Sequence, residues 1–124
     1  MVFGYFSNKR REKMLQQLSD SRPNLTRAEY VNRLVKKGFN KHQAEIVHDV
    51  IREFIQMDNF SIYPEDDIHK IYAVEDLDDV ELIDVICKKL NLREVVQEDI
   101  DELDKTLKIF NAEYILTLTN HISV

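Results

Sequence analysis

Acidic side chains crowd one short stretch in the second half of the chain, where they could attract a basic ligand or stabilise a helix. Five of seven consecutive residues carry a carboxylate: Glu75, Asp76, Asp78, Asp79 and Glu81. An exposed carboxylate in the first turn of a helix contributes about 0.3–1 kcal/mol, because it faces the positive end of the helix dipole. Neighbouring carboxylates repel one another, so capping alone does not require all five. We predict that they form a docking surface for a basic partner, with a solvated helix end as the simpler alternative.

The other reactive residues do not form a metal-binding or catalytic pattern. Asp66 and Asp67 lack the alternating oxygen ligands and the central glycine of an EF-hand loop. Residues of the zinc-binding types have no paired spacing: His42, His48, His69, His121 and Cys87. The sequence contains no glycine-rich phosphate loop and no serine in a glycine-flanked turn. We therefore predict no catalytic residue, no metal and no cofactor, and expect that the protein is not an enzyme.

The composition favours a helical protein. Hydrophobic residues make up 44% of the 124 residues and charged residues 32%, which is ordinary for a soluble globular chain. The chain has only two glycines and two prolines, the residues that most often form tight turns. Their scarcity favours long helices over β-hairpins. The single cysteine fits a reducing compartment, and no apolar run approaches the roughly 18–20 residues that span a bilayer. We expect an all-α protein of the cytoplasm without stable membrane insertion.

Charge is divided unevenly along the chain, whose net charge is −6. Residues 1–58 contain eleven Lys and Arg against seven Asp and Glu, a net of +4. Residues 59–124 contain six against sixteen, a net of −10. Because complementary fields speed encounter and fix orientation, the acidic half is expected to meet a basic protein surface and not nucleic acid.

Capping signals and apolar spacing locate the expected helices. Thr26 and Glu29 form a capping box, and Gly38 is the expected end of that helix. Asn40 and Gln43 predict a second capping box at the start of the next helix. Helical periodicity predicts helices at 41–56, 76–90, 96–103 and 106–119. The expected core consists of Val47, Val50, Phe54, Val80, Ile83, Ile86, Cys87, Leu90, Phe110 and Tyr114, with Ile68 and Tyr72 as plugs from the intervening loop.

The N-terminal tract combines aromatic and basic residues. Val2, Phe3, Tyr5 and Phe6 precede a weak predicted helix over 8–19, whose first half contains Lys9, Arg10, Arg11 and Lys13. We predict that this tract docks on the protein's own core or on a partner. Membrane contact and disorder are the alternatives.

Residues 62–82 resemble the acyl carrier protein family. In that family a loop beginning Ile-x-Pro-Glu leads to Asp-Ser-Leu-Asp-x-Val-Glu-Leu, and the serine carries the phosphopantetheine arm. The chain keeps the family's residues at Pro64, Glu65, Leu77, Asp78, Val80, Glu81 and Leu82. Asp76 stands at the serine position, and a carboxylate cannot form the serine phosphodiester. The resemblance therefore implies an acyl-carrier-like four-helix bundle over 40–124, after a helical extension over 1–39, as one compact unit without the prosthetic group.

The leading functional prediction is a non-catalytic, acyl-carrier-like protein that binds a basic partner through its acidic helix. The alternative is an immunity-type inhibitor of a basic toxin, because small, acidic, four-helical proteins of that type have a Tyr-Pro near a short helix, and Tyr63-Pro64 resembles it. A true carrier with another attachment site is a third possibility. Ser61 is the nearby serine for that role, but it lies at the wrong end of the loop.

Overall fold

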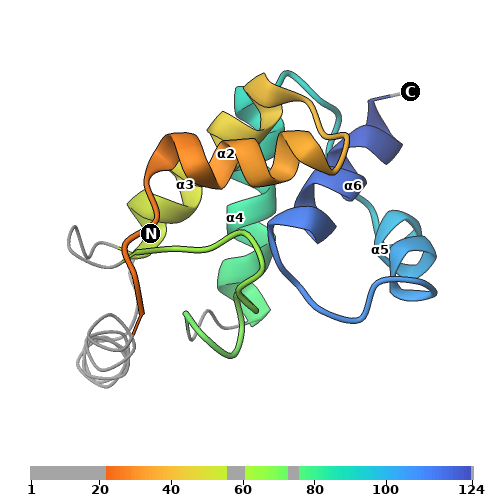
Figure 1. The fold of residues 1–124 in the computed structure, drawn as a ribbon. Coiled ribbons are helices and arrows are strands. Elements are labelled where there is room, and N and C mark those ends of the chain that lie inside the picture. The colour runs from red at the N-terminus through yellow and green to blue at the C-terminus, as the bar shows by residue number, and fades with distance from the viewer. Residues whose placement is uncertain (1–21, 56–60, 73–75, 124) are drawn as a thin grey trace.

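The computed structural model describes residues 22–55, 61–72 and 76–123. These residues form five helices and no strand, so the prediction of an all-α protein is confirmed for this part of the chain. In chain order the helices are α2 (Arg27–Lys36), α3 (Lys41–Ile55), α4 (Asp76–Lys89), α5 (Gln97–Asp104) and α6 (Ala112–Ile122), as Figure 1 shows. The helix predicted over 8–19 and the residues around it lie outside the described residues. No helix in the described part of the chain is both long enough and apolar enough to cross a membrane.

Local signals set the ends of α2 and the start of α3. The Thr26 hydroxyl accepts from the Glu29 amide at 3.1 Å, and the Glu29 carboxylate accepts from the Thr26 amide at 3.0 Å, which is the predicted capping box. Gly38 follows α2 at φ 98°, a left-handed conformation that glycine adopts without steric cost. Asn40 caps α3 by accepting from the Gln43 amide at 3.0 Å. The Gln43 side-chain oxygen is buried without a hydrogen-bond partner, so only half of the second predicted box is confirmed.

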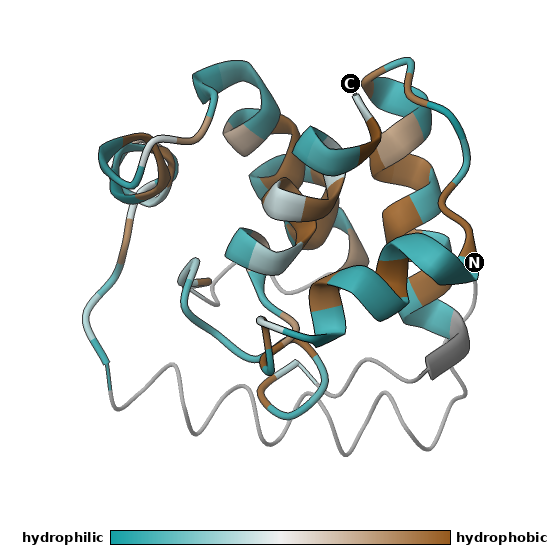
Figure 2. Ribbon diagram, turned by 90° about the vertical axis from the view of Figure 1, so that its right-hand side faces the viewer, coloured by the Kyte–Doolittle hydropathy of each residue, from teal (hydrophilic) through white to brown (hydrophobic). Residues whose placement is uncertain are grey.

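The hydrophobic core surrounds α3, which packs against α2, α4 and α6. Figure 2 shows hydrophobic and hydrophilic residues alternating around the helices, as amphipathic packing requires. Most of the predicted core is confirmed as buried: Val47, Val50, Phe54, Ile83, Ile86, Cys87, Phe110 and Tyr114, with Leu90 partly buried. Tyr30, Val31 and Leu34 of α2 belong to the same core. Val80 was wrongly assigned to the core, because it lies in the hollow between α4 and α5, where it is 64% exposed.

The last helix begins later than the periodicity predicted. Residues 106–111 precede α6, and the Asn111 side chain accepts from the Tyr114 amide at 2.9 Å as the N-cap. Just before the cap, the Phe110 carbonyl accepts from the Ile68 amide at 2.8 Å and ties this stretch to the segment 61–72. The prediction of a helix over 106–119 is therefore wrong at its start, because Leu107 and Phe110 pack from irregular backbone. The helix runs to Ile122.

Candidate docking groove between α4 and α5

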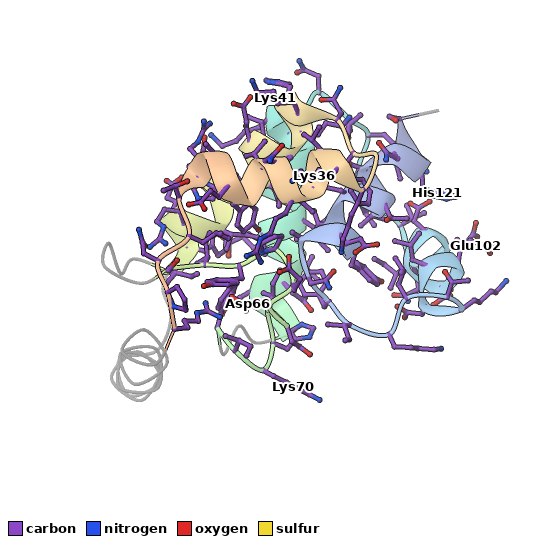
Figure 3. All side chains as sticks on the ribbon, viewed as in Figure 1. Lys36, Lys41, Asp66, Lys70, Glu102 and His121 are labelled. Atoms are coloured by element: carbon purple, nitrogen blue, oxygen red, sulfur yellow. The ribbon has the colours of Figure 1, made fainter. Side chains whose placement is uncertain are left out.

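Polar contacts hold α5 against α6. The Tyr114 hydroxyl donates to the Asp104 carboxylate at 2.8 Å, and Asp99 and His121 form a contact of 3.3 Å between Oδ1 and Nε2. Burial raises the pKa of Tyr114, and the bond to Asp104 raises it further. In Figure 1, α5 lies at the edge of the molecule beside α6, and in Figure 3 the labelled His121 lies on the α5 side of α6. The contacts with α6 thus fix the position of α5, and the side of α4 that faces α5 stays open.

Asp99 fixes the start of α5. Its side chain is 6% exposed, and its two oxygens accept from the Arg93 guanidinium at 2.9 Å each. The same carboxylate accepts from the Val96 amide at 2.9 Å, which caps the helix. The bonds from Arg93 and then from the Val96 amide hold the pKa of Asp99 well below its usual range. This arrangement presents Val95 and Val96 beside the open face of α4.

An apolar groove with an acidic rim separates the two helices. It has a volume of about 570 Å³, and its floor and walls contain Val80, Ile83, Val95, Val96 and Ile100. Val80 and Val96 are 64% and 52% exposed, although both are large apolar residues. Glu81, Asp84 and Glu94 supply the charge of the lining, which among the described residues contains no lysine or arginine. We call this hollow the α4–α5 groove.

A second hollow adjoins the α4–α5 groove and shares Val80, Ile83, Gln97 and Ile100 with it. Its volume is about 520 Å³, and its wall includes His69, whose Nε2 lies 2.6 Å from an Asp79 oxygen. The His69 ring also stacks on Phe110 with centroids 4.9 Å apart. Its lining carries both signs of charge, with Lys70 and Lys108 as the cations. Of these two hollows, the α4–α5 groove is the one whose described lining combines apolar side chains with acidic charge alone.

The structure describes the side chains of three members of the predicted acidic cluster: Asp78, Asp79 and Glu81. Glu75 lies outside the described residues, and Asp76 is the first residue of α4. Asp78 is partly buried, and Asp79 faces the second hollow, where it is bonded to His69. Of these three described side chains, Glu81 alone lines the α4–α5 groove. Asp79 and Glu81 thus border different hollows, on either side of Val80.

The groove residues that α5 and the preceding loop contribute were not predicted from the sequence. Glu94, Val96 and Ile100 complete the lining, and none of them belongs to the predicted acidic cluster. The sequence carries one signal for them, since the adjacent pair Val95-Val96 interrupts an otherwise polar stretch from 93 to 99. An apolar pair in a polar loop indicates either a core contact or an exposed contact surface.

A buried polar network fixes the segment 61–72. Asp66 receives two bonds from the Arg22 guanidinium, at 2.8 and 2.9 Å, one from the Tyr72 hydroxyl at 2.6 Å and one from the Tyr63 amide at 3.0 Å. Burial opposes the charge of Arg22, but the contacts with Asp66 raise the pKa of Arg22 overall. In Figure 3, Asp66 lies among packed side chains, whereas Lys70 of the same segment points away from the fold.

The other residues of the segment 61–72 for which we made predictions are also held within the fold. Ile68 and Tyr72 are each 1% exposed, which confirms their prediction as core plugs. Burial raises the pKa of the Tyr72 hydroxyl well above its ordinary value. Ser61 is buried, and its hydroxyl accepts from the Leu25 amide at 2.6 Å, so it is not presented for attachment of a carrier arm. The Tyr63 ring lies under the guanidinium groups of Arg22 and Arg33 and is thus used within the fold.

Other titratable side chains serve packing. Cys87 is 2% exposed, and burial raises the pKa of its thiol, which disfavours the reactive thiolate. His48 is buried beside Tyr30, and burial lowers its pKa. Across the described ranges, no group of three or more His, Cys, Asp or Glu side chains is placed to hold a metal ion.

Comparison of the chain with protein-family models, with curated proteins and with solved structures gives no match.

Proposed function

We propose that the protein is a non-catalytic binding module whose α4–α5 groove accepts a short basic segment of a partner protein. The single observation that carries the proposal is the exposure of Val80 and Val96 at 64% and 52% inside a groove that carboxylates border. Large apolar side chains that stay exposed together indicate an interaction surface. The volume of about 570 Å³ falls in the range of clefts that hold bound groups, about 300–1,000 Å³.

The lining defines the chemistry of the partner. Glu81, Asp84 and Glu94 can accept hydrogen bonds from lysine or arginine, and the valines can cover aliphatic or aromatic side chains. A helix with one apolar stripe between basic residues combines both properties, and helix-in-groove recognition is a common mode of peptide binding. Asp84 already pairs with Lys88 at 2.9 Å, so Glu81 and Glu94 are the carboxylates assigned to the partner.

This proposal moves the expected docking surface from the start of α4 to the next turns of that helix. An acyl-carrier-like bundle that lacks the prosthetic group remains our hypothesis for its origin, with Asp76 at the serine position. An immunity-type inhibitor would be one special case of a module that binds a basic surface. The predicted sign of the partner's charge is the same in each case.

Fluorescence anisotropy with a defined probe tests the proposal. The probe is a fluorescein-labelled synthetic helix with leucines on one face and lysines on the other. We expect the double variant Val80→Ser with Val96→Ser to weaken binding at least about tenfold, which corresponds to 1.4 kcal/mol. The pair Glu81→Gln with Glu94→Gln should weaken binding and flatten its salt dependence, because fewer charges are screened.

Matched changes elsewhere provide the controls. Val35 on α2 is 39% exposed and Glu102 on α5 is exposed, and neither lines the α4–α5 groove. Figure 3 shows Glu102 pointing away from the molecule. Val35→Ser and Glu102→Gln should therefore leave the probe affinity unchanged. Equal affinities for the groove variants and these controls would refute the proposed site.

A further inference from the structure

We infer that a partner helix bound in the α4–α5 groove continues into the second hollow and places acidic side chains beside Lys70 and Lys108. The inference rests on the proposed function, since it extends the same docking surface. It narrows the partner to an amphipathic helix that is acidic at one end and basic at the other.

One apolar strip joins the two hollows. Val80, Ile83 and Ile100 line both of them. Val96 lines only the α4–α5 groove and Ile109 only the second hollow, and these two side chains are 52% and 51% exposed. Three of the four large apolar side chains that are exposed among the described residues thus lie in this strip. A partner that covered the α4–α5 groove alone would leave Ile109 in water.

Helix α5 sets the length of the combined surface. Val96, just before α5, lines the α4–α5 groove, and Asp104, the last residue of α5, lines the second hollow. The eight residues of α5 extend about 12 Å at 1.5 Å per residue. One helical turn is about 5.4 Å, so a partner helix of roughly two to three turns reaches both hollows.

The aspartates of the second hollow are already used within the fold. Asp79 contacts His69, and Asp104 accepts from the Tyr114 hydroxyl. The remaining aspartate, Asp67, accepts from a backbone amide of its own turn at 3.0 Å. These carboxylates therefore hold the walls of the hollow together.

The two lysines of the second hollow have no such partner. The Lys108 ammonium donates to the Asp104 carbonyl at 2.8 Å, which is a neutral group. Among the described residues no carboxylate pairs with Lys70 or Lys108, and Figure 3 shows Lys70 pointing away from the fold. The unused hydrogen-bonding groups of these lysines are charged donors, for which a carboxylate is the strongest acceptor. A partner that is lysine-rich throughout would instead bring like charges together here.

The order of charges also fixes the direction of the bound helix. A helix is most stable with acidic residues in its first turn and basic residues in its last turn. The partner helix is therefore expected to begin over the second hollow and to end over the α4–α5 groove. It then runs antiparallel to α5, which begins at the α4–α5 groove and ends at the second hollow.

Fluorescence anisotropy with two labelled helices tests the inference. One is the leucine–lysine probe, and the other has the same leucine face with glutamates in its N-terminal half and lysines in its C-terminal half. Changing Lys70 and Lys108 together to Gln should weaken binding of the glutamate-containing probe about fivefold, because two exposed ion pairs are lost. The same change should not weaken binding of the leucine–lysine probe.

Lys36→Gln with Lys41→Gln is the matched control. Both lysines are exposed and line neither hollow, and Figure 3 shows them away from Lys70. This control should leave both affinities unchanged. An equal loss in the control, or equal weakening of both probes by the change at Lys70 and Lys108, would overturn the inference. The proposed function fails separately, if the Val80 and Val96 variant binds the leucine–lysine probe as tightly as its own control.

The direction of binding is measured by NMR of the nitrogen-15-labelled protein with a nitroxide on one end of the glutamate-containing probe. A nitroxide on the acidic end should broaden the amide signals of Lys70 and Lys108 more strongly than those of Glu94 and Val96. A nitroxide on the basic end should do the opposite. Equal broadening at both sites, or the reverse pattern, would overturn the inference.

Discussion

Breaking the Arg22–Asp66 pair should cost much of the stability of this fold. The Arg22 and Asp66 side chains are only 15% and 8% exposed, so neither charge is well solvated if its partner is lost. Both carboxylate oxygens of Asp66 accept hydrogen bonds. In Asp66→Asn an amide nitrogen replaces one of these oxygens. Whichever way the amide is turned, its N–H groups then face an N–H donor of Arg22.

The size of the effect follows from this burial. Removing one partner of a buried ion pair costs about 3–5 kcal/mol, because the other charge stays uncompensated. Asn keeps the shape of Asp66 and one acceptor for the Tyr63 amide, so we expect about 3 kcal/mol for Asp66→Asn. Urea unfolding at neutral pH, followed by circular dichroism, measures the free energy of unfolding.

The neighbouring Glu65 provides a matched control. Its ion pair with Arg33 is exposed, at 48% and 43% of the two side chains, and an exposed pair contributes less than about 1 kcal/mol. Glu65→Gln makes the same chemical change one residue away and should have a small effect. The double variant Arg22→Leu with Asp66→Asn should cost less than the sum of the single changes, because both remove the same interaction. If Asp66→Asn and Glu65→Gln destabilise equally, the network does not hold the segment 61–72.

Two further predictions concern the core. Ile86 is 0% exposed, so Ile86→Ala should lower the free energy of unfolding by about 2–5 kcal/mol. Val80→Ala on the same helix should lower it by less than about 0.5 kcal/mol. Equal losses in urea unfolding would contradict the assignment of the buried and exposed faces of α4. The pKa values of Tyr30, Tyr72 and Tyr114 are raised in the fold, chiefly by burial. In the unfolded chain these tyrosines ionise first, at pH about 10. Their contribution to the free energy of unfolding is therefore complete below pH about 10 and is lost as the pH rises above it. The urea midpoint should therefore fall above pH about 10, and a midpoint that stays constant to pH about 11 would refute this.

Local signals in the sequence located most of the helices. The capping box at Thr26, the glycine at Gly38 and the cap at Asn40 act within a few residues, so the sequence alone contains their partners. The start of α6 was missed, although Asn111 before an apolar run is a cap signal of the same kind. There the apolar periodicity of Leu107 and Phe110 was interpreted as helix.

Contacts between distant residues could not be predicted in this way. Arg22 and Asp66 are 44 residues apart, and no local pattern indicates that Arg22 is bonded to the middle of the later loop. The acidic cluster illustrates the same limit. Its composition was evident from the sequence, but the division of Asp79 and Glu81 between two hollows depends on where α5 lies.

The position of α5 is set by polar contacts, and this explains why an apolar groove remains open. Arg93, Asp99 and His121 join the start of α5 to the preceding loop and to α6, and Asp104 joins its end to Tyr114. Apolar contact alone would favour closing α5 onto α4, since that would remove Val80 and Val96 from water at about 25 cal/mol per Å² of apolar surface. The polar contacts oppose that closure, because Asp99 would lose its contacts with Arg93 and His121 in a mostly buried site. The exposure of Val80 and Val96 is thus a consequence of where the polar contacts hold α5, and it is the feature on which the proposed docking function rests.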